Sequence, residues 1–328
     1  MNESRGMPSA LSRRFGARLS LPLIAAPMFR VSGPDLVIAA CRAGVIGAFP
    51  TANCRSLEEF DAWLTRIAAA LGPGHAPWCP NLIMRRESLR DELAVLLRHK
   101  PEVVITSVGP PDPVVAPLHD IGTMVLCDVA SVRHAEKAVA AGVDGLILLT
   151  AGAGGQTGWA NGFAFVRAVR EFFDGPVVLA GGVSDGAAVL AAQVLGCDAA
   201  YMGTKFIATE ESMAVAGYKR MLVESRLDDI LLSKAFTGLE TNTLRPSIIA
   251  AGLDPAALPT DMAPERAREL YGSGGSTGVK RWADIWSAGH SVSGVHAVCD
   301  VATLVDRTRE EYRQAARAAL PVLNAAAG

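Results

Sequence analysis

The segment VVLAGGVSDGAAVLAAQVLGCDAAYM, residues 177–202, contains two short apolar runs separated by a longer stretch of helical period. The runs Val177–Ala180 and Ala199–Met202 have the length of buried strands, and the stretch Asp185–Leu195 opens with a helix-starting Asp. Strands joined by a crossover helix are typical of a parallel sheet. The segment therefore predicts one strand–helix–strand unit.

The same alternation begins near residue 21 and predicts eight strands in all. They are Leu23–Ala26, Val45–Phe49, Trp78–Ile83, Val103–Ser107, Thr123–Asp128, Gly145–Leu149, Val177–Ala180 and Ala199–Met202. The helices predicted between them are Pro34–Arg42, Leu57–Leu71, Ser88–His99, Pro113–His119, Ser131–Ala141, Gly162–Phe173 and Asp185–Leu195. The predicted fold is of the α/β class, a (β/α)8 or TIM barrel. A doubly wound open sheet is the structural alternative, but no glycine-rich dinucleotide fingerprint follows the first strand.

The periodicity changes after the eighth strand. Residues 211–290 contain helical segments, proline-rich turns and the loop GSGGSTG at residues 272–278, which is typical of a hinge. A last amphipathic helix is predicted over Val301–Ala319. We therefore expect a barrel over residues 1–210, a helical cap over the barrel mouth at residues 211–290, and a C-terminal part, residues 291–328, that returns to the barrel wall.

Composition favours small-molecule chemistry. Half of the 328 residues are hydrophobic, and the formal net charge is −2 with acidic and basic residues mixed along the chain. This balance gives no electrostatic footprint for nucleic acid or for an anionic membrane. No apolar stretch approaches the roughly 20 residues of a membrane span, and Pro22 and Pro27 break the apolar run that a signal peptide would need. The sequence predicts a cytoplasmic protein.

The six cysteines are scattered without a CxxC pair or a metal-ligand spacing. This pattern is expected of reduced thiols in a cytosolic protein, most of them small core residues. No metal site is predicted.

Glycines gather where the last three predicted strands end. The sixth strand runs into TAGAGGQTG at residues 150–158, the seventh into Gly181-Gly182 and the eighth into Gly203-Thr204. Any one of these glycines is explained by a tight turn, but three successive glycine-rich strand ends favour a phosphate site, which this fold often places after its last strands. Phosphate alone does not identify the ligand, and sugar phosphates and other cofactors stay open.

Several segments together resemble one known family. They are LIAAPM at residues 23–28, AGAGGQTGW at residues 151–159, AGGVSDGAAVLAAQVLGCDAAYMGTKFIATEES at residues 180–212, FTGLETNTLRPSIIAAGLD at residues 236–254 and IWSAGHSVSGVH at residues 285–296. In these segments the chain is similar to the nitronate monooxygenase family, formerly called 2-nitropropane dioxygenases. The resemblance covers almost the whole chain from residue 21.

The resemblance implies FMN as the cofactor. It implies that Gly181, Gly182, Gly203 and Thr204 hold the phosphate, and that the isoalloxazine ring lies near Ala26, Pro27 and Met28. It also places Asn81 as a hydrogen-bond partner of the flavin, with Gly154, Gly155, Asp128 and Ser131 as further contacts. A polar Asn inside an apolar strand that ends at the barrel mouth agrees with a ligand role, although a strand-end Asn also caps turns.

One residue departs from the family pattern. Members that deprotonate a neutral nitroalkane carry a histidine after the Gly-Gly pair, where this chain has Gln156. An amide donates and accepts hydrogen bonds but cannot take a proton near neutral pH, so Gln156 is expected to orient a substrate oxygen. His290, which the resemblance places near the active-site mouth, is a candidate replacement base because an ordinary imidazole pKa is about 6.5.

The sequence thus predicts an FMN-dependent monooxygenase that oxidises a small carbanionic substrate, such as a nitronate, with dioxygen. Gln156 and His290 are its candidate catalytic residues. Two alternatives stay open: an NAD(P)H-dependent FMN reductase of quinones or enoyl thioesters, and a flavin-binding protein that has lost catalysis. The oligomeric state is also open, with a homodimer as the assembly considered. Trp159 is a candidate wall of the pocket, and Trp282 and Trp286 are expected to anchor one helical face.

Overall fold

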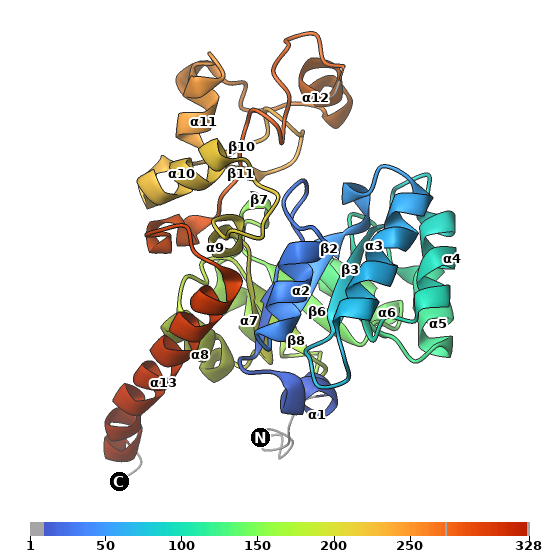
Figure 1. The fold of residues 1–328 in the computed structure, drawn as a ribbon. Helices are drawn as coiled ribbons and strands as arrows, with labels where there is room; N and C mark the ends of the chain where they lie inside the picture. Colours follow the sequence, from blue (N-terminus) through green and yellow to red (C-terminus); the bar gives the residue numbers. More distant parts are fainter. Residues whose placement is uncertain (1–9, 273, 327–328) are drawn as a thin grey trace.

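A computed structural model describes residues 10–272 and 274–326, and its centre is a closed barrel of eight parallel strands (Figure 1). In barrel order the strands are β1 (Leu23–Ala25), β2 (Ile46–Pro50), β3 (Trp78–Ile83), β4 (Val103–Ser107), β5 (Met124–Val129), β6 (Gly145–Leu149), β8 (Val177–Ala180) and β9 (Ala199–Met202). The ring closes where β1 pairs with β9, with Ile24 opposite Tyr201. The predicted (β/α)8 barrel is confirmed.

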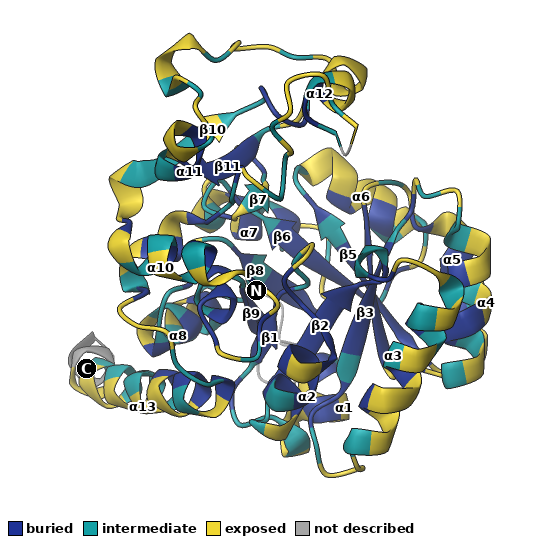
Figure 2. Ribbon diagram, turned by 45° about the horizontal axis from the view of Figure 1, so that its top comes forward, coloured by how far each residue is buried: buried dark blue, intermediate teal, exposed yellow. Residues whose placement is uncertain are grey.

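Helices cover the outside of the barrel, with their exposed residues turned away from the strands (Figure 2). They are α2 (Pro34–Arg42), α3 (Leu57–Ala70), α4 (Leu89–His99), α5 (Asp112–Asp120), α6 (Val132–Ala140), α7 (Gly162–Val169) and α8 (Gly186–Leu195). Four of them, α3, α6, α7 and α8, begin after a residue whose side chain accepts a backbone N–H of the first turn, as when Asp185 accepts the N–H of Ala188 at 2.8 Å. Helix α7 ends at Val169 rather than at Phe173, because Arg170 donates to the carbonyl of Phe173 and folds the chain into a turn.

A short N-terminal helix that the sequence analysis missed closes one end of the barrel. Helix α1 (Ala10–Phe15) and the 3-10 turn η2 (Gly16–Arg18) lie below the N-terminal ends of the strands (Figure 1). Leu11 and Phe15 are almost completely buried and join the apolar cluster formed by the inward-facing strand residues. The α1 side chains therefore extend the barrel core at this end.

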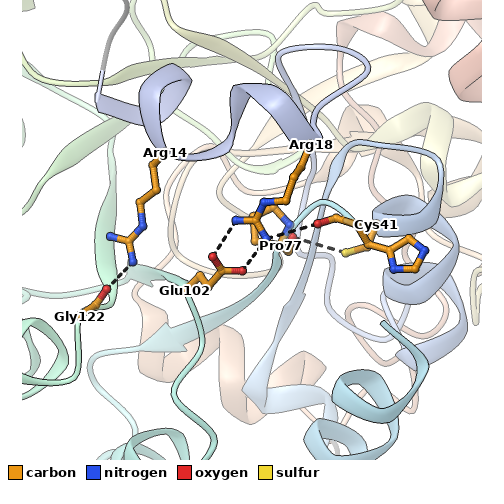
Figure 3. A network of polar contacts seen from close by, with 7 residues as sticks. Arg14, Arg18, Cys41, Pro77, Glu102 and Gly122 are labelled. Atoms are coloured by element: carbon orange, nitrogen blue, oxygen red, sulfur yellow. Dashed lines mark hydrogen bonds and ion pairs between the residues drawn. The ribbon is translucent and has the colours of Figure 1, made fainter. Parts of the chain in front are cut away.

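Two arginines bind the N-terminal segment to the residues just before the strands β4 and β5 (Figure 3). Arg14 donates to the carbonyl of Gly122, and Arg18 makes two hydrogen bonds with the Glu102 carboxylate at 2.9 and 2.6 Å. Arg18 also lies 5.5 Å from the centre of the Phe15 ring, so its guanidinium packs over the same ring that fills the barrel. This end of the barrel is held by polar contacts outside and an aromatic ring inside.

At the other end, the segment after β9 is not purely helical, and the expected helical cap needs this correction. It contains helices α9 (Thr204–Ile207), α10 (Ala216–Glu224), α11 (Arg245–Ala250) and α12 (Pro264–Tyr271), the 3-10 turns η4 (Leu227–Asp229), η5 (Pro255–Ala257) and η6 (His290–Gly294), and strands β10 (Ile230–Ser233) and β11 (Thr241–Leu244). These strands form an antiparallel sheet with β7 (Gly155–Gln156), which belongs to the glycine-rich loop after β6. A barrel loop therefore supplies one strand of the cap sheet.

The C-terminal helix α13 (Val301–Ala326) is longer than the predicted Val301–Ala319 and runs along α8 (Figure 1). The two helices approach closely at Gly186, where a Cβ would lie 2.0 Å from the backbone nitrogen of Tyr312. Across the same contact Glu311 accepts the N–H of Gly186 at 3.0 Å. Gly186 thus permits a distance between the helices that no larger residue would allow.

Among the described helices, none combines the length and the apolar composition that crossing a bilayer requires. All six cysteines are free thiols. Within the described residues, no three His, Cys, Asp or Glu side chains come together as a metal site would need.

Candidate active site at the C-terminal ends of the strands

The loop after β1 is held rigidly over the barrel. The Ala26 N–H donates to the carbonyl of Met202 at 2.9 Å, which ties the loop to the end of β9. Ser32 accepts the N–H of Met28 at 3.0 Å and donates to the carbonyl of Ala26 at 3.2 Å. Asn53 donates to the carbonyl of Met28 at 3.0 Å. The chain around Pro27 is thereby fixed from both sides.

The loop after β8 passes close to the end of β6 and then opens onto free space. Gly181 has φ +116° and Gly182 has φ +75°, values that L side chains rarely adopt. A Cβ on Gly181 would lie 2.4 Å from the hydroxyl oxygen of Thr150, whereas a Cβ on Gly182 would meet no atom within 4 Å. The backbone of Gly182 therefore borders open space that a side chain would fill.

The loop after β9 borders the loop after β1 and the segment that carries His290. A Cβ on Gly203 would lie 3.4 Å from the sulfur of Met28. The hydroxyl of Thr204 accepts the N–H of Gly289 at 2.9 Å, so the end of β9 is joined to the segment that carries His290. Gly203 after β9 thus lies beside the Ala26–Met28 loop, whereas Gly181 and Gly182 after β8 lie close to Gly152 of the loop after β6.

The glycine-rich loop after β6 is shaped by a residue from the cap. The buried Asn242 of β11 donates to the carbonyls of Ala151 and Ala153 at 2.8 and 2.7 Å. A Cβ on Gly154 would lie 2.7 Å from the nitrogen of Gly289, so the loop and the His290 segment are packed backbone to backbone. Gly155 pairs with Asn242 in the cap sheet.

Gln156 and His290 both lie at this end of the barrel and are exposed. The His290 N–H donates to the carbonyl of Gly152 at 3.0 Å, and a Cβ on Gly152 would lie 3.4 Å from the Nδ1 of His290. The same Cβ would lie 3.0 Å from the nitrogen of Gly182, so the imidazole is close to the strand ends. Gln156 pairs with Thr241 at the edge of the cap sheet, with its side chain free of hydrogen bonds to described residues.

Polar side chains form the floor of the site, inside the barrel. The buried Asn81 of β3 accepts a hydrogen bond from Ser107 of β4 at 3.0 Å. On β5 and β9, the Oδ1 of Asp128 and the hydroxyl of Tyr201 are buried without any hydrogen-bond partner in the described residues. Burial raises the pKa of the Asp128 carboxyl to about 7. Unpaired buried polar atoms are costly, and they concentrate at functional sites.

Sequence reasoning missed the residues that position the site. Asn242 was not singled out, although it lies inside the segment 236–254, and neither were Ser32 and Asn53, which follow the first and second predicted strands. Tyr201 gave a weak signal as the one polar side chain of a short apolar strand. The loop geometry that makes these residues important is tertiary, and no local pattern reports it.

The tryptophan assignments need correction. Trp282 is not helical but has φ +67°, and it forms part of a turn in which Asp284 accepts the N–H of Lys280 at 2.7 Å. Trp286 stacks on Tyr218 with ring centres 5.1 Å apart. Trp159 is 75% exposed beside the glycine-rich loop.

Comparison with known proteins gives a consistent family signal. The family model described as nitronate monooxygenase matches residues 76–308. A protein named nitronate monooxygenase from Paraburkholderia phytofirmans (strain DSM 17436 / LMG 22146 / PsJN) is 29% identical over 278 residues, which cover 71% of this chain and 76% of that protein. Among solved structures, nitroalkane oxidase from Streptomyces ansochromogenes superposes with a TM-score of 0.77 at 26% identity, covering 94% of this chain and 99% of that one.

A relative with a different named reaction is equally similar. The protein named (3aS,4S,5R,7aS)-5-hydroxy-7a-methyl-1-oxo-octahydro-1H-indene-4-carboxyl-CoA dehydrogenase, from Mycobacterium tuberculosis (strain ATCC 25618 / H37Rv), is 27% identical over 231 residues. The match covers 70% of this chain but only 64% of that relative, less than two thirds of its length. Similarity at this level therefore does not distinguish between substrates.

Proposed function

The chain belongs to the nitronate monooxygenase family of oxidoreductases, and from this premise we propose that it uses FMN to oxidise a small carbanionic substrate, such as a nitronate, with dioxygen. The observation that carries the proposal is the open space over Gly182 at the end of β8, together with Gly203 at the end of the neighbouring β9, which lies beside Met28 of the loop after β1. Glycine backbone at a strand end beside free space is what an anionic cofactor group needs for close approach.

The residues at the strand ends fit FMN by their chemistry. Gly181, Gly182, Gly203 and Thr204 would hold the phosphate through their backbone amides, because they follow the adjacent strands β8 and β9. The Ala26–Met28 loop would border the ring, while Asn81 and Asp128 offer polar atoms below it, and Gly154 and Gly155 border the site from the β6 side. FMN would supply the redox chemistry, and the protein would supply binding and orientation.

Gln156 determines which form of the substrate this site can use. Its amide can donate a hydrogen bond to a nitronate oxygen and so hold an anionic substrate in place. It cannot remove the α-proton of a neutral nitroalkane. His290 is the candidate to do so, since its ring lies beside Gly152 and Gly182 at the same strand ends. We therefore expect a preformed nitronate to be the better substrate.

Two measurements test the proposal. The purified protein should show the visible absorption of an oxidised flavin at about one FMN per chain. Anaerobic mixing with a nitronate should bleach that absorption, and admitting dioxygen should restore it. A colourless protein that takes up no added FMN would contradict the cofactor assignment, and a yellow protein that no nitronate bleaches would contradict the reaction.

A reductase is the second candidate, favoured by the similar identity to the Mycobacterium tuberculosis relative that is named as an indene-carboxyl-CoA dehydrogenase. In that case NADH or NADPH alone should bleach the flavin, and a quinone or an enoyl thioester should reoxidise it. If neither nitronate nor reduced nicotinamide bleaches a stoichiometrically bound FMN, the third alternative, a flavin-binding protein without catalysis, is favoured.

A further inference from the structure

We propose that Asp128 and Tyr201 form a proton-holding pair in the floor of the site, and that the charge of this pair sets how flavin affinity changes with pH. The inference rests on the proposed flavin site and goes beyond it, because it assigns a role to two buried groups that neither holds the phosphate nor reaches the substrate side. It is carried by the positions of the two side chains inside the barrel.

Both residues occupy inward-facing positions of their strands. On β5, Met124 and Leu126 belong to the interior cluster, and Asp128 follows in the same alternation one step nearer the mouth. On β9, Ala199 and Tyr201 belong to that cluster too. The carboxyl oxygen Oδ1 and the phenolic hydroxyl are both buried, and neither has a hydrogen-bond partner in the described residues.

Among the residues that the structure describes, no cation lies close enough to Asp128 to stabilise its charge. Burial alone accounts for the raised pKa of its carboxyl, about 7. The titratable groups that interact with it are the Tyr201 phenol, the Cys79 thiol of β3 and the neighbouring Cys127 thiol. Burial raises the pKa values of Tyr201 and Cys79 well above their usual range and that of Cys127 to about 11. The flanking strands β4 and β6 contribute Ile105, Ser107, Ile147 and Leu149 to the interior, and none of these is charged. A proton is therefore the one counter-charge available to Asp128.

A cofactor over the mouth would remove water from Asp128. The residue is only partly buried, and Oδ1 rather than the whole carboxyl is sealed from solvent. Covering the remaining surface penalises the carboxylate more than the neutral acid. Flavin binding is then linked to protonation, so the pKa of Asp128 must be higher with flavin bound than without it. FMN affinity should consequently fall as the pH rises past the Asp128 pKa of the flavin-free protein.

The first test is the titration of the carboxyl in the full chain without flavin. Infrared difference spectra with isotope-labelled aspartate, taken between about pH 5.5 and about pH 8.5, should show one protonated carboxyl losing its proton in wild type. The signal should be absent in Asp128→Asn. If wild type shows no such titration because all aspartates ionise at their ordinary pKa of about 4, the proton-holding pair does not exist. This readout does not depend on flavin binding.

The second test is the pH dependence of the FMN dissociation constant, measured by flavin fluorescence quenching. If binding shifts the Asp128 pKa by about one unit, wild-type affinity weakens about tenfold between pH 6 and pH 9 relative to Asp128→Asn, whose side chain is isosteric and cannot titrate. The phosphate of FMN titrates identically in both proteins. Equal pH profiles in the two proteins would overturn the proposal while leaving the flavin site intact, whereas absence of FMN binding at every pH would overturn the proposed function.

Two further variants locate the effect. Glu92→Gln neutralises another buried carboxylate, but one whose oxygens are satisfied by Thr51, Arg86 and Ser88, so its pH profile should match wild type. Tyr201→Phe removes a hydroxyl that can donate to the Asp128 carboxylate, and should move the infrared transition to higher pH. An unmoved transition in Tyr201→Phe would remove Tyr201 from the pair, and a flattened profile in Glu92→Gln would show that the effect is not specific to Asp128.

Discussion

The N-terminal end of the barrel is filled by the buried side chains of Leu11 and Phe15. The C-terminal end, with its glycine loops and cap, holds the three buried side-chain polar atoms that lack a hydrogen-bond partner in the described residues, on Asp128, Tyr201 and Ser287. Polar groups at the closed end are satisfied, even where there is space. A cavity of about 370 Å³ lies there, lined among others by Arg18, Arg42 and Arg309, and each of these arginines already binds a carboxylate or a carbonyl. Open space alone therefore does not make a functional site.

The two ends of the barrel differ in what their residues do. At the closed end, burial and ion pairing lower the free energy of the folded chain. At the open end, the unpaired buried Oδ1 of Asp128 costs stability, and the proposed flavin site would explain why it is kept. In this fold, residues at the strand C-termini serve chemistry and residues at the N-termini serve stability.

The strongest test of the difference between the two ends introduces a leucine at one glycine of each end, at positions with similar φ angles and similar free space. Gly182→Leu should abolish FMN retention, because its side chain would fill the space proposed for the phosphate. Gly122→Leu is the matched control, since Gly122 has φ +78° against +75° and a Cβ there also meets no atom within 4 Å. Both variants carry the same backbone strain. Copurified flavin should be lost in the first alone, and equal retention in both would move the phosphate site elsewhere.

The next effect concerns the chemistry of the open end. Gln156→His should raise the turnover of a neutral nitroalkane by about 10² or more, because a positioned general base contributes about 10²–10⁴ in rate. Nitronate turnover should change much less and is the internal control. If wild type already uses the nitroalkane well, His290→Ala should remove that activity. Efficient nitroalkane oxidation that survives His290→Ala would contradict the roles given to both residues.

At the closed end, Phe15→Ala should lower the free energy of unfolding by about 3–5 kcal/mol, because it leaves a cavity inside the barrel. Chemical denaturation measures this loss. Phe163→Ala, at a position that is 69% exposed, should change stability by less than about 0.5 kcal/mol. The FMN dissociation constant of folded Phe15→Ala should equal that of wild type. A large change in that constant would show that the two ends are not independent.

The unpaired carboxyl predicts how stability depends on pH. The folded-state pKa of Asp128, about 7, exceeds its ordinary value of 3.8, so the folded chain holds the proton longer than the unfolded chain. The contribution of Asp128 to the free energy of unfolding is fully present below about pH 4 and is lost as the pH rises to about 7. Without flavin, the free energy of unfolding of wild type should therefore fall by about 2–4 kcal/mol between pH 4 and pH 8 relative to that of Asp128→Asn, which has no carboxyl at this position. Parallel stability curves of the two proteins between pH 4 and pH 8 would contradict this.

The smallest effect belongs to the ion pair at the closed end. Glu102→Gln removes the charge that Arg18 binds, in a pair whose Glu102 side chain is 46% exposed. Exposed pairs contribute about 0.2–1 kcal/mol and are screened by salt. The loss measured by denaturation should therefore shrink at high salt. A loss that is large and independent of salt would show that the pair positions α1 rather than merely adding to its stability.

The sequence predicted the barrel because buried parallel strands are written as short apolar runs, and this local signal needs no tertiary information. Helix α1 was not predicted because its amphipathic segment, Leu11 to Phe15, is only about one turn long, which is too few residues for a helical period to be recognised. The cap sheet was not predicted because its strand β7 has only two residues, both in the glycine-rich loop. These residues pair with β11, which lies far along the chain.

The candidate site divides in the same way. Glycines at strand ends, Asn81 and the departure at Gln156 were visible as residue types in motifs. The unpaired state of Asp128 and Tyr201 was not visible, because it depends on which side chains the other strands place inside the barrel. The supporting role of Asn242 depends on a contact with residues about 90 positions earlier, which no single-sequence pattern encodes.

Asn242 has a consequence for engineering by loop exchange. It binds the Ala151 and Ala153 carbonyls, while β11 pairs with β7, so the glycine-rich loop takes its shape from the cap rather than from its own sequence. A chimera can take residues 150–160 from a relative but keep its own residues 230–244. The side chain at position 242 and the carbonyls that it binds would then come from different proteins. Residues 150–160 and residues 230–244 therefore have to be exchanged together. A chimera should fold and function normally only when both stretches come from the same parent protein.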